Sequence, residues 1–105
     1  MVYQFTTPNI IFHMPEAIHA EDITTGILTF SQKNRTVLEK ENIEWVVDPV
    51  GNLITVGLSQ EETGAFSVGT LKMQIHFLIG SQAFATKEME ITVAKNLHQE
   101  VLTNG

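Results

Sequence analysis

The sequence predicts an all-β fold, an immunoglobulin-like antiparallel β-sandwich of about seven strands with one short helical turn near residues 59–66. Two observations carry this prediction. Apolar residues alternate with polar ones along much of the chain and do not recur at helical spacing. Turn-forming residues interrupt the apolar runs about every 8–12 positions, and connections this short make neighbouring strands antiparallel.

The segment 71–79 is the clearest predicted strand. Its odd-numbered positions are all apolar, whereas Lys72, Gln74 and His76 alternate with them. Side chains on a strand point to opposite faces in turn, so this segment buries one face and exposes the other. The further strands are predicted at residues 9–14, 23–32, 36–40, 43–48, 54–58 and 85–93. Residues 1–95 form a single domain, and residues 96–105 are expected to be a partly flexible tail.

Three short polar or glycine-containing segments predict turns between strands, at 32–35, 49–52 and 80–82. In the segment 43–48, Ile43, Trp45 and Val47 share the inward face, and Trp45 is expected to anchor the interface between the sheets. Gly26 and Gly57 lie inside predicted strands, where glycine indicates a bulge or a close backbone approach.

The break in the alternating pattern begins at Ser59. Ser59 and Glu62 have the spacing of a capping box, in which each side chain bonds the backbone N–H of the other residue. A single helical turn here would carry the chain from one sheet to the other, with Phe66 entering the end of the core.

Charge and composition exclude several classes of function. The chain has 105 residues with no cysteine, and its net charge is −6 at neutral pH. Disulfide scaffolds and cysteine-ligated zinc sites are therefore excluded, and repulsion from phosphate argues against nucleic-acid and membrane-surface partners. No apolar run is long enough to span a bilayer, and the first residues carry no Sec signal pattern.

No catalytic or cofactor-binding motif is present, so the sequence predicts no cofactor, no metal and no enzyme. The four histidines form no H-x-H or H-x-x-x-H pair. A hydrolase or metal site would require His13 or His76 to meet Glu16, Glu21 or Asp22 across loops.

Three apolar residues fall on predicted outward faces: Ile27, Val46 and Leu78. Isolated exposed aliphatic residues are ordinary on protein surfaces. If these three lie on neighbouring strands, however, they form a patch suited to a partner subunit. They are the candidate interface residues.

Several of these segments resemble small proteins of about a hundred residues that prophages of Gram-positive bacteria encode. More remotely, the strand plan is similar to the N-terminal domain of phage baseplate upper proteins. The resemblance implies a phage structural or accessory protein and transfers no active-site residues. It also implies synthesis in the cytoplasm of the bacterial host, with incorporation into a virion as a further expectation. The segments that carry it are Thr7–Phe12, Ile23–Gln32, Asn52–Val56, Leu58–Thr63, Lys72–Ile75 and Asn96–Leu102.

The expected function is therefore assembly: a non-enzymatic tail, baseplate or head-decoration subunit that associates with itself or with other virion proteins. The alternative is a carbohydrate- or host-surface-binding sandwich module. That alternative requires exposed aromatic residues, yet Tyr3 is the single tyrosine and Trp45 is expected inside.

Overall fold

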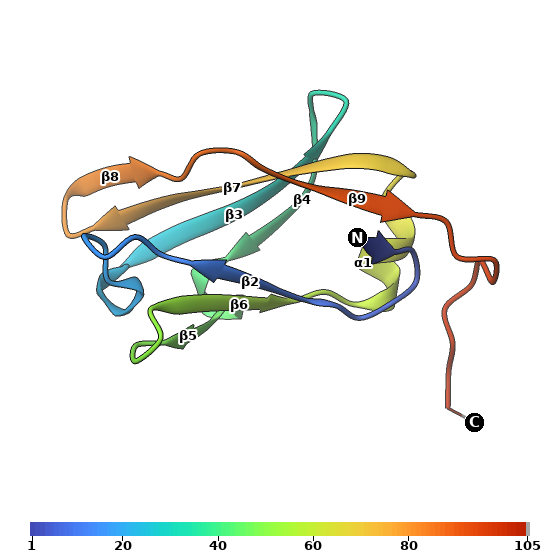
Figure 1. The fold of residues 1–105 in the computed structure, drawn as a ribbon, viewed down its shortest axis with the longest axis horizontal. Helices are drawn as coiled ribbons and strands as arrows, with labels where there is room; N and C mark the ends of the chain where they lie inside the picture. The colour runs from blue at the N-terminus through green and yellow to red at the C-terminus, as the bar shows by residue number, and fades with distance from the viewer. Residues whose placement is uncertain (105) are drawn as a thin grey trace.

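The computed structural model describes residues 1–104, which form two packed β-sheets (Figure 1). The large sheet has the strand order β1-β9-β7-β3-β4, and β8 also pairs with β7; the small sheet has the order β2-β6-β5. All pairs are antiparallel except β1 with β9. The predicted all-β sandwich is confirmed. The strands are β1 (Val2–Tyr3), β2 (Asn9–His13), β3 (Thr25–Gln32), β4 (Arg35–Glu41), β5 (Val46–Asp48), β6 (Leu53–Gly57), β7 (Gly69–Ile79), β8 (Gln82–Ala85) and β9 (Met89–Ala94).

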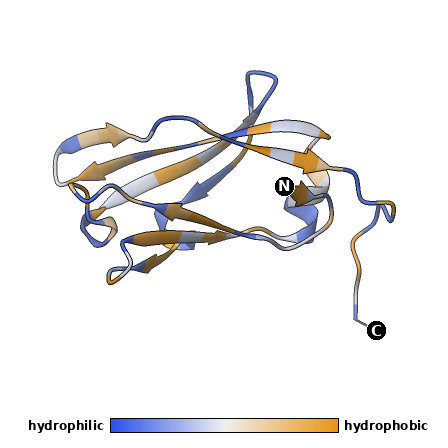
Figure 2. Ribbon diagram, in the orientation of Figure 1, coloured by the Kyte–Doolittle hydropathy of each residue, from blue (hydrophilic) through white to orange (hydrophobic). Residues whose placement is uncertain are grey.

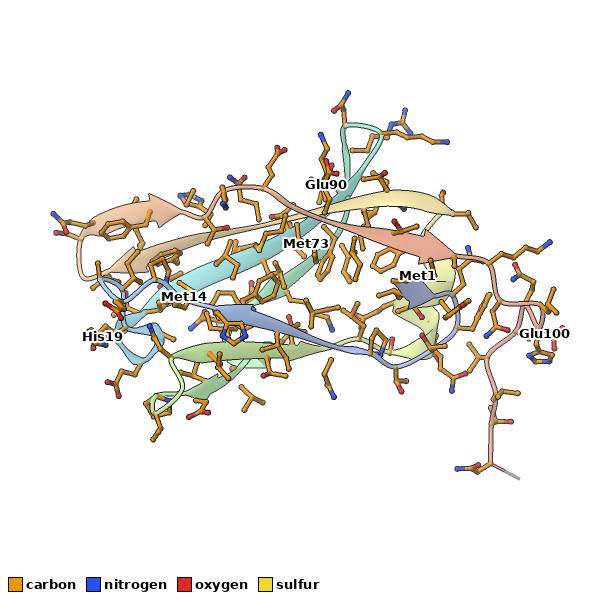
Figure 3. The ribbon with its side chains drawn as sticks, in the orientation of Figure 1. Met1, Met14, His19, Met73, Glu90 and Glu100 are labelled. Carbon is orange, nitrogen blue, oxygen red and sulfur yellow. The ribbon has the colours of Figure 1, made fainter. Side chains whose placement is uncertain are left out.

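The core lies between the inner faces of the two sheets. In β7 the predicted alternation is confirmed, since Leu71, Ile75 and Phe77 are buried while Gln74 and His76 are exposed. In Figure 3, Met73 of the same strand lies between the layers, whereas Glu90 of β9 projects into solvent. Other large apolar side chains that are almost completely buried are Leu28, Phe30, Ile54, Val56, Phe66 and Val93.

Two of the predicted turns require backbone conformations that few residues adopt. Lys33 and Asn34, between β3 and β4, have φ angles of 51° and 61°, which matches a two-residue hairpin loop of type I′. The turn after β5 also forms, but its left-handed residue is Asn52 at φ 54°, and not Gly51. Asparagine tolerates this conformation better than most residues.

The predicted helical corner forms as α1 (Gln60–Ala65). The Glu62 N–H donates to the Ser59 hydroxyl at 3.1 Å, and the Ser59 N–H donates to the Glu62 carboxylate at 2.8 Å. The capping box is thus confirmed, and Phe66 is buried as expected. Buried polar side chains then fix the corner: Gln4 donates to the Phe66 carbonyl, and Gln32 exchanges two hydrogen bonds with the Ser67 backbone.

The predicted strand 43–48 is only partly correct. Asn42–Glu44 forms a short 3₁₀ helix, η2, and the strand β5 begins at Val46. Ile43 is 85% exposed and was wrongly assigned to the core. The reason is a second capping box, between Glu41 and Glu44, which turns the chain as it crosses from the large sheet to the small one.

Trp45 closes the core at this crossing. It is 8% exposed, and its indole N–H donates to the Lys40 carbonyl at 3.1 Å. Its ring lies directly over Gly26, where an added Cβ would approach the indole Cη2 to 2.5 Å. The predicted close approach at Gly26 is therefore confirmed, and so is the role of Trp45 as an anchor between the sheets.

The predicted strand 85–93 is two strands, β8 and β9, which pair with successive parts of β7. Thr86 lies between the two strands. Its hydroxyl accepts the Ile75 N–H at 3.1 Å, so a side chain takes the place of a backbone carbonyl and the regular strand pairing is interrupted. The alternation changes phase at this point. Regular alternation over residues 85–93 predicts Ala85 on the same face as Met89. In the structure Ala85 pairs with outward-facing His76, whereas Met89 pairs with buried Met73, so this prediction for Ala85 is wrong.

Beyond β9, residues 96–104 contain no helix or strand and extend away from the sandwich (Figure 1). Leu97 is 95% exposed. The Gln60 side chain exchanges two hydrogen bonds with the Leu102 backbone, at 2.7 and 3.0 Å. Gly105 of the predicted tail lies outside the described residues. Nowhere in residues 1–104 does a helix reach the length and apolar content needed to cross a membrane.

Candidate interaction surface

The outer face of the small sheet is apolar and nearly uncharged. Strand register places Ile11, Thr55 and Val46 in one row across β2, β6 and β5. Ile11 is 54% and Val46 68% exposed. The next row holds His13, Leu53 and Asp48. Figure 2 shows hydrophobic colour along most of this sheet.

Asp48 is the one acidic or basic residue in the strands of the small sheet apart from His13. Its carboxylate accepts hydrogen bonds from the backbone N–H groups of Val50 and Gly51, at 3.0 and 3.2 Å. The carboxylate is therefore engaged by its own hairpin turn. The rest of this face offers a partner methyl groups, a hydroxyl and an imidazole.

The large sheet differs sharply from the small one. Its outer face carries Glu39 and Glu41 on β4 and the cross-strand pair Lys72 and Glu90 on β7 and β9. Lys72 also lies 3.8 Å from Glu88. Charged residues are depleted from the centres of protein interfaces, so this part of the sandwich suits solvent better than a partner.

The three candidate interface residues divide between the sheets. Ile27 and Leu78 are diagonal neighbours on β3 and β7, because Ile27 pairs with His76 and Leu78 with Thr25. Both are half-buried. Val46 lies on the small sheet and is not brought together with them. The other aliphatic residue in its row is Ile11, on the far side of Thr55, which the sequence reasoning did not select.

The free edge of β2 borders this surface. Hydrogen bonds at both ends of the strand, Leu58 N–H to the Pro8 carbonyl and Met14 N–H to the Asn52 carbonyl, are each 3.0 Å long. In antiparallel pairs the bonded residues alternate along a strand. Even-numbered residues of β2 therefore bond to β6, and the backbone groups of Asn9, Ile11 and His13 point away from the sheet.

An apolar groove of about 400 Å³ opens beside the end of this edge. It lies between the two sheets, where β2 ends and where β8 gives way to β9. Met14 is labelled at this position in Figure 3. The side chains that line the groove include Phe12, Met14, Ile18, Phe77 and Met89, with His13 and Lys87 also contributing.

Asn52 organises one wall of the groove. Its side-chain amide accepts the Ala20 N–H at 2.8 Å and donates to the carbonyls of Met14, Pro15 and Ile18 at 3.3, 3.2 and 2.8 Å. A single side chain thereby ties the segment after β2 to the β5–β6 turn. The sequence identified this turn but gave no signal for these contacts, which join residues more than thirty positions apart.

A partly buried ion pair holds the opposite side of the sandwich. The Lys40 ammonium, on the inner face of β4, lies 2.7 Å from the Glu62 carboxylate of α1. Burial acts to raise the pKa of Glu62, but the Lys40 hydrogen bond and charge together with the Ser59 contacts outweigh it and lower the pKa. A lowered folded-state pKa means that this stabilisation is present at neutral pH and is lost as pH falls through that pKa.

The predicted alternative in which His13 or His76 meets Glu16, Glu21 or Asp22 in a metal-holding cluster is not seen in the described residues. His13 projects from the outer face of the small sheet and His76 from the outer face of the large sheet, so the two lie on opposite sides of the sandwich. Within residues 1–104 no three histidine, aspartate or glutamate side chains gather closely enough to hold a metal ion.

The fold and these surfaces define an all-β sandwich with one charged and one uncharged outer face. Comparison of the chain with protein-family models, with curated proteins and with solved structures found no significant match. The relationship to prophage-encoded proteins stays a prediction, and function is argued from the surface itself.

Proposed function

We propose that this chain is a non-enzymatic structural or accessory protein of a phage or prophage, a tail, baseplate or head-decoration subunit that acts by protein–protein assembly. The observation that carries the proposal is the outer face of the small sheet. There Ile11 and Val46 are more than half exposed in one cross-strand row, and the carboxylate of Asp48 is turned to its own hairpin. Thr55 lies between these two aliphatic side chains, so the row combines apolar groups with one uncharged hydroxyl, and low charge is typical of the centres of protein interfaces.

The alternative, a carbohydrate-binding module, has less support. Stacking against a sugar requires an exposed aromatic ring, and the indole of Trp45 is packed over Gly26. Tyr3, on the two-residue strand β1, is 52% exposed but has no second exposed aromatic residue beside it in its strand pair with β9. The assembly proposal uses the exposed residues that are present.

Solution mass tests the proposal. Light scattering behind size exclusion, over a hundredfold range of protein concentration, is expected to give a mass that rises above the 11.7 kDa of one chain. Since each copy carries a net charge of −6 and the proposed contact is uncharged, added salt is expected to strengthen the association.

Salt dependence serves as the internal control. A contact made by ion pairs would weaken with salt, whereas an apolar contact between like-charged molecules would tighten. A mass that stays at 11.7 kDa at every concentration and salt level would contradict self-association as the mode of assembly.

A further inference from the structure

The edge of β2 lacks the features that keep β-sheet edges from pairing. Proteins protect edges with charges, inward-pointing lysines, bulges, proline or very short strands. The edge strand β4 of the large sheet has several of these features. Lys40 points inward between the acidic residues Glu39 and Glu41. The pairing of β4 with β3 also shifts register, between Phe30 and Ser31. The edge strands β1, β5 and β8 contain two, three and four residues.

By contrast, β2 is a five-residue strand, NIIFH, with no aspartate, glutamate, lysine or arginine and no proline. Its register with β6 is continuous from Asn9 to His13. The unbonded N–H and C=O groups of its odd-numbered residues face outward along a regular edge. Such an edge is a template for another strand.

We propose that two copies of this chain pair through their β2 strands, antiparallel and about a two-fold axis at Ile11. This inference rests on the proposed function and names its partner and surface. Ile11 of each copy would exchange both backbone hydrogen bonds with Ile11 of the other, and Asn9 would pair with the second copy's His13. The two small sheets would become one continuous sheet, as an isologous contact requires.

Charge favours this edge over others. Both copies carry −6, so any contact that brings acidic side chains together is opposed. The three residues whose backbone would pair, Asn9, Ile11 and His13, include no acidic side chain. In the proposed register His13 of one copy lies opposite Asn9 of the other, and the two Ile11 residues face each other. No two side chains of like charge are therefore directly opposite.

The groove supplies apolar area that strand pairing alone would not bury. Stable interfaces usually bury about 1,200 Å² or more, and the pairing of two short edges provides less. The groove of about 400 Å³ lies at the His13 end of β2, so in the antiparallel pair each groove lies beside the Asn9 end of the other copy's strand. Phe12 and Met14 are already buried, so the added apolar burial comes from the half-buried residues that line the groove, Ile18 and Met89. The dimer is therefore expected to be weak and concentration-dependent.

Three substitutions at Ile11 test the pairing. Ile11→Pro removes the outward N–H and leaves the bonds to β6 intact, and proline is tolerated where a strand N–H faces solvent. Ile11→Lys places two like charges across the two-fold axis. The matched control, Ile11→Thr, keeps the N–H and the β-branched shape. Light scattering is expected to show dimerisation weakened at least tenfold by the first two and only a few-fold by the control.

Folding of each variant is checked by the unfolding transition and by Trp45 fluorescence, so loss of the dimer is not confused with loss of the fold. If the wild-type chain associates and neither Ile11→Pro nor Ile11→Lys weakens it, the β2 contact is wrong while assembly stands. Disruption by Leu78→Lys instead would assign the interface to the large sheet. A wild-type chain that stays monomeric at every concentration would overturn the β2 pairing and self-association as the mode of assembly.

Discussion

Replacing Trp45 with alanine is expected to lower the free energy of unfolding by about 3–5 kcal/mol, the range for removing a large buried aromatic side chain. The indole fills the crossing between the two sheets and packs on Gly26. Because glycine has no side chain, nothing on Gly26 can fill the space that the indole leaves. Domains of this size are commonly stable by only about 5–15 kcal/mol, so the variant would be close to unfolding at room temperature.

Urea unfolding followed by circular dichroism measures this effect without the tryptophan signal. The matched control is Trp45→Phe, which keeps an aromatic ring in the crossing but loses the hydrogen bond from the indole N–H to the Lys40 carbonyl. That control is expected to cost less than the alanine variant. A loss below about 1 kcal/mol for Trp45→Ala would show that the crossing is not part of the folded core.

Asn52→Ala is expected to destabilise the fold by about 2–4 kcal/mol. The substitution removes the amide that holds Ala20, Met14, Pro15 and Ile18, and it places alanine at φ 54°. Backbone groups near the groove would lose their partners, so the groove wall would loosen as well.

Asn52→Gly separates the two causes. Glycine accepts the left-handed conformation at little cost but also lacks the side-chain amide, so it is expected to fall between the wild type and Asn52→Ala. Thermal or urea unfolding of the three proteins gives the order. Equal stability for the alanine and glycine variants would mean that backbone strain contributes nothing at this turn.

Local patterns in the sequence predicted the elements with strong alternation or with paired capping residues. The strand around Met73 and the Ser59–Glu62 corner are examples, because period and spacing act within a few residues. The pattern failed at the other crossing between the sheets, from β4 to β5. Ile43 reads as an inward strand residue, yet the Glu41–Glu44 capping box turns the chain there and leaves it exposed.

The candidate surface was harder to predict because it depends on which strands become neighbours. Val46 was selected correctly as outward-facing, but the apolar residue that shares its cross-strand row is Ile11 on β2, beyond Thr55, and not Ile27 or Leu78. Ile11 gave a signal that could have been used: it is apolar at a position where a half-buried strand usually exposes a polar residue. No comparable signal in the sequence indicated the hydrogen bonds that the Asn52 side chain makes.

Amide hydrogen exchange along β2 tests the central claim, that this protein assembles through the free edge of its small sheet. At low concentration the amides of Ile10 and Phe12 are expected to be protected by their bonds to β6, while those of Asn9, Ile11 and His13 exchange quickly. At high concentration we expect the three odd-numbered amides to become protected too. Fast exchange at Ile11 under conditions where the mass has doubled would contradict it.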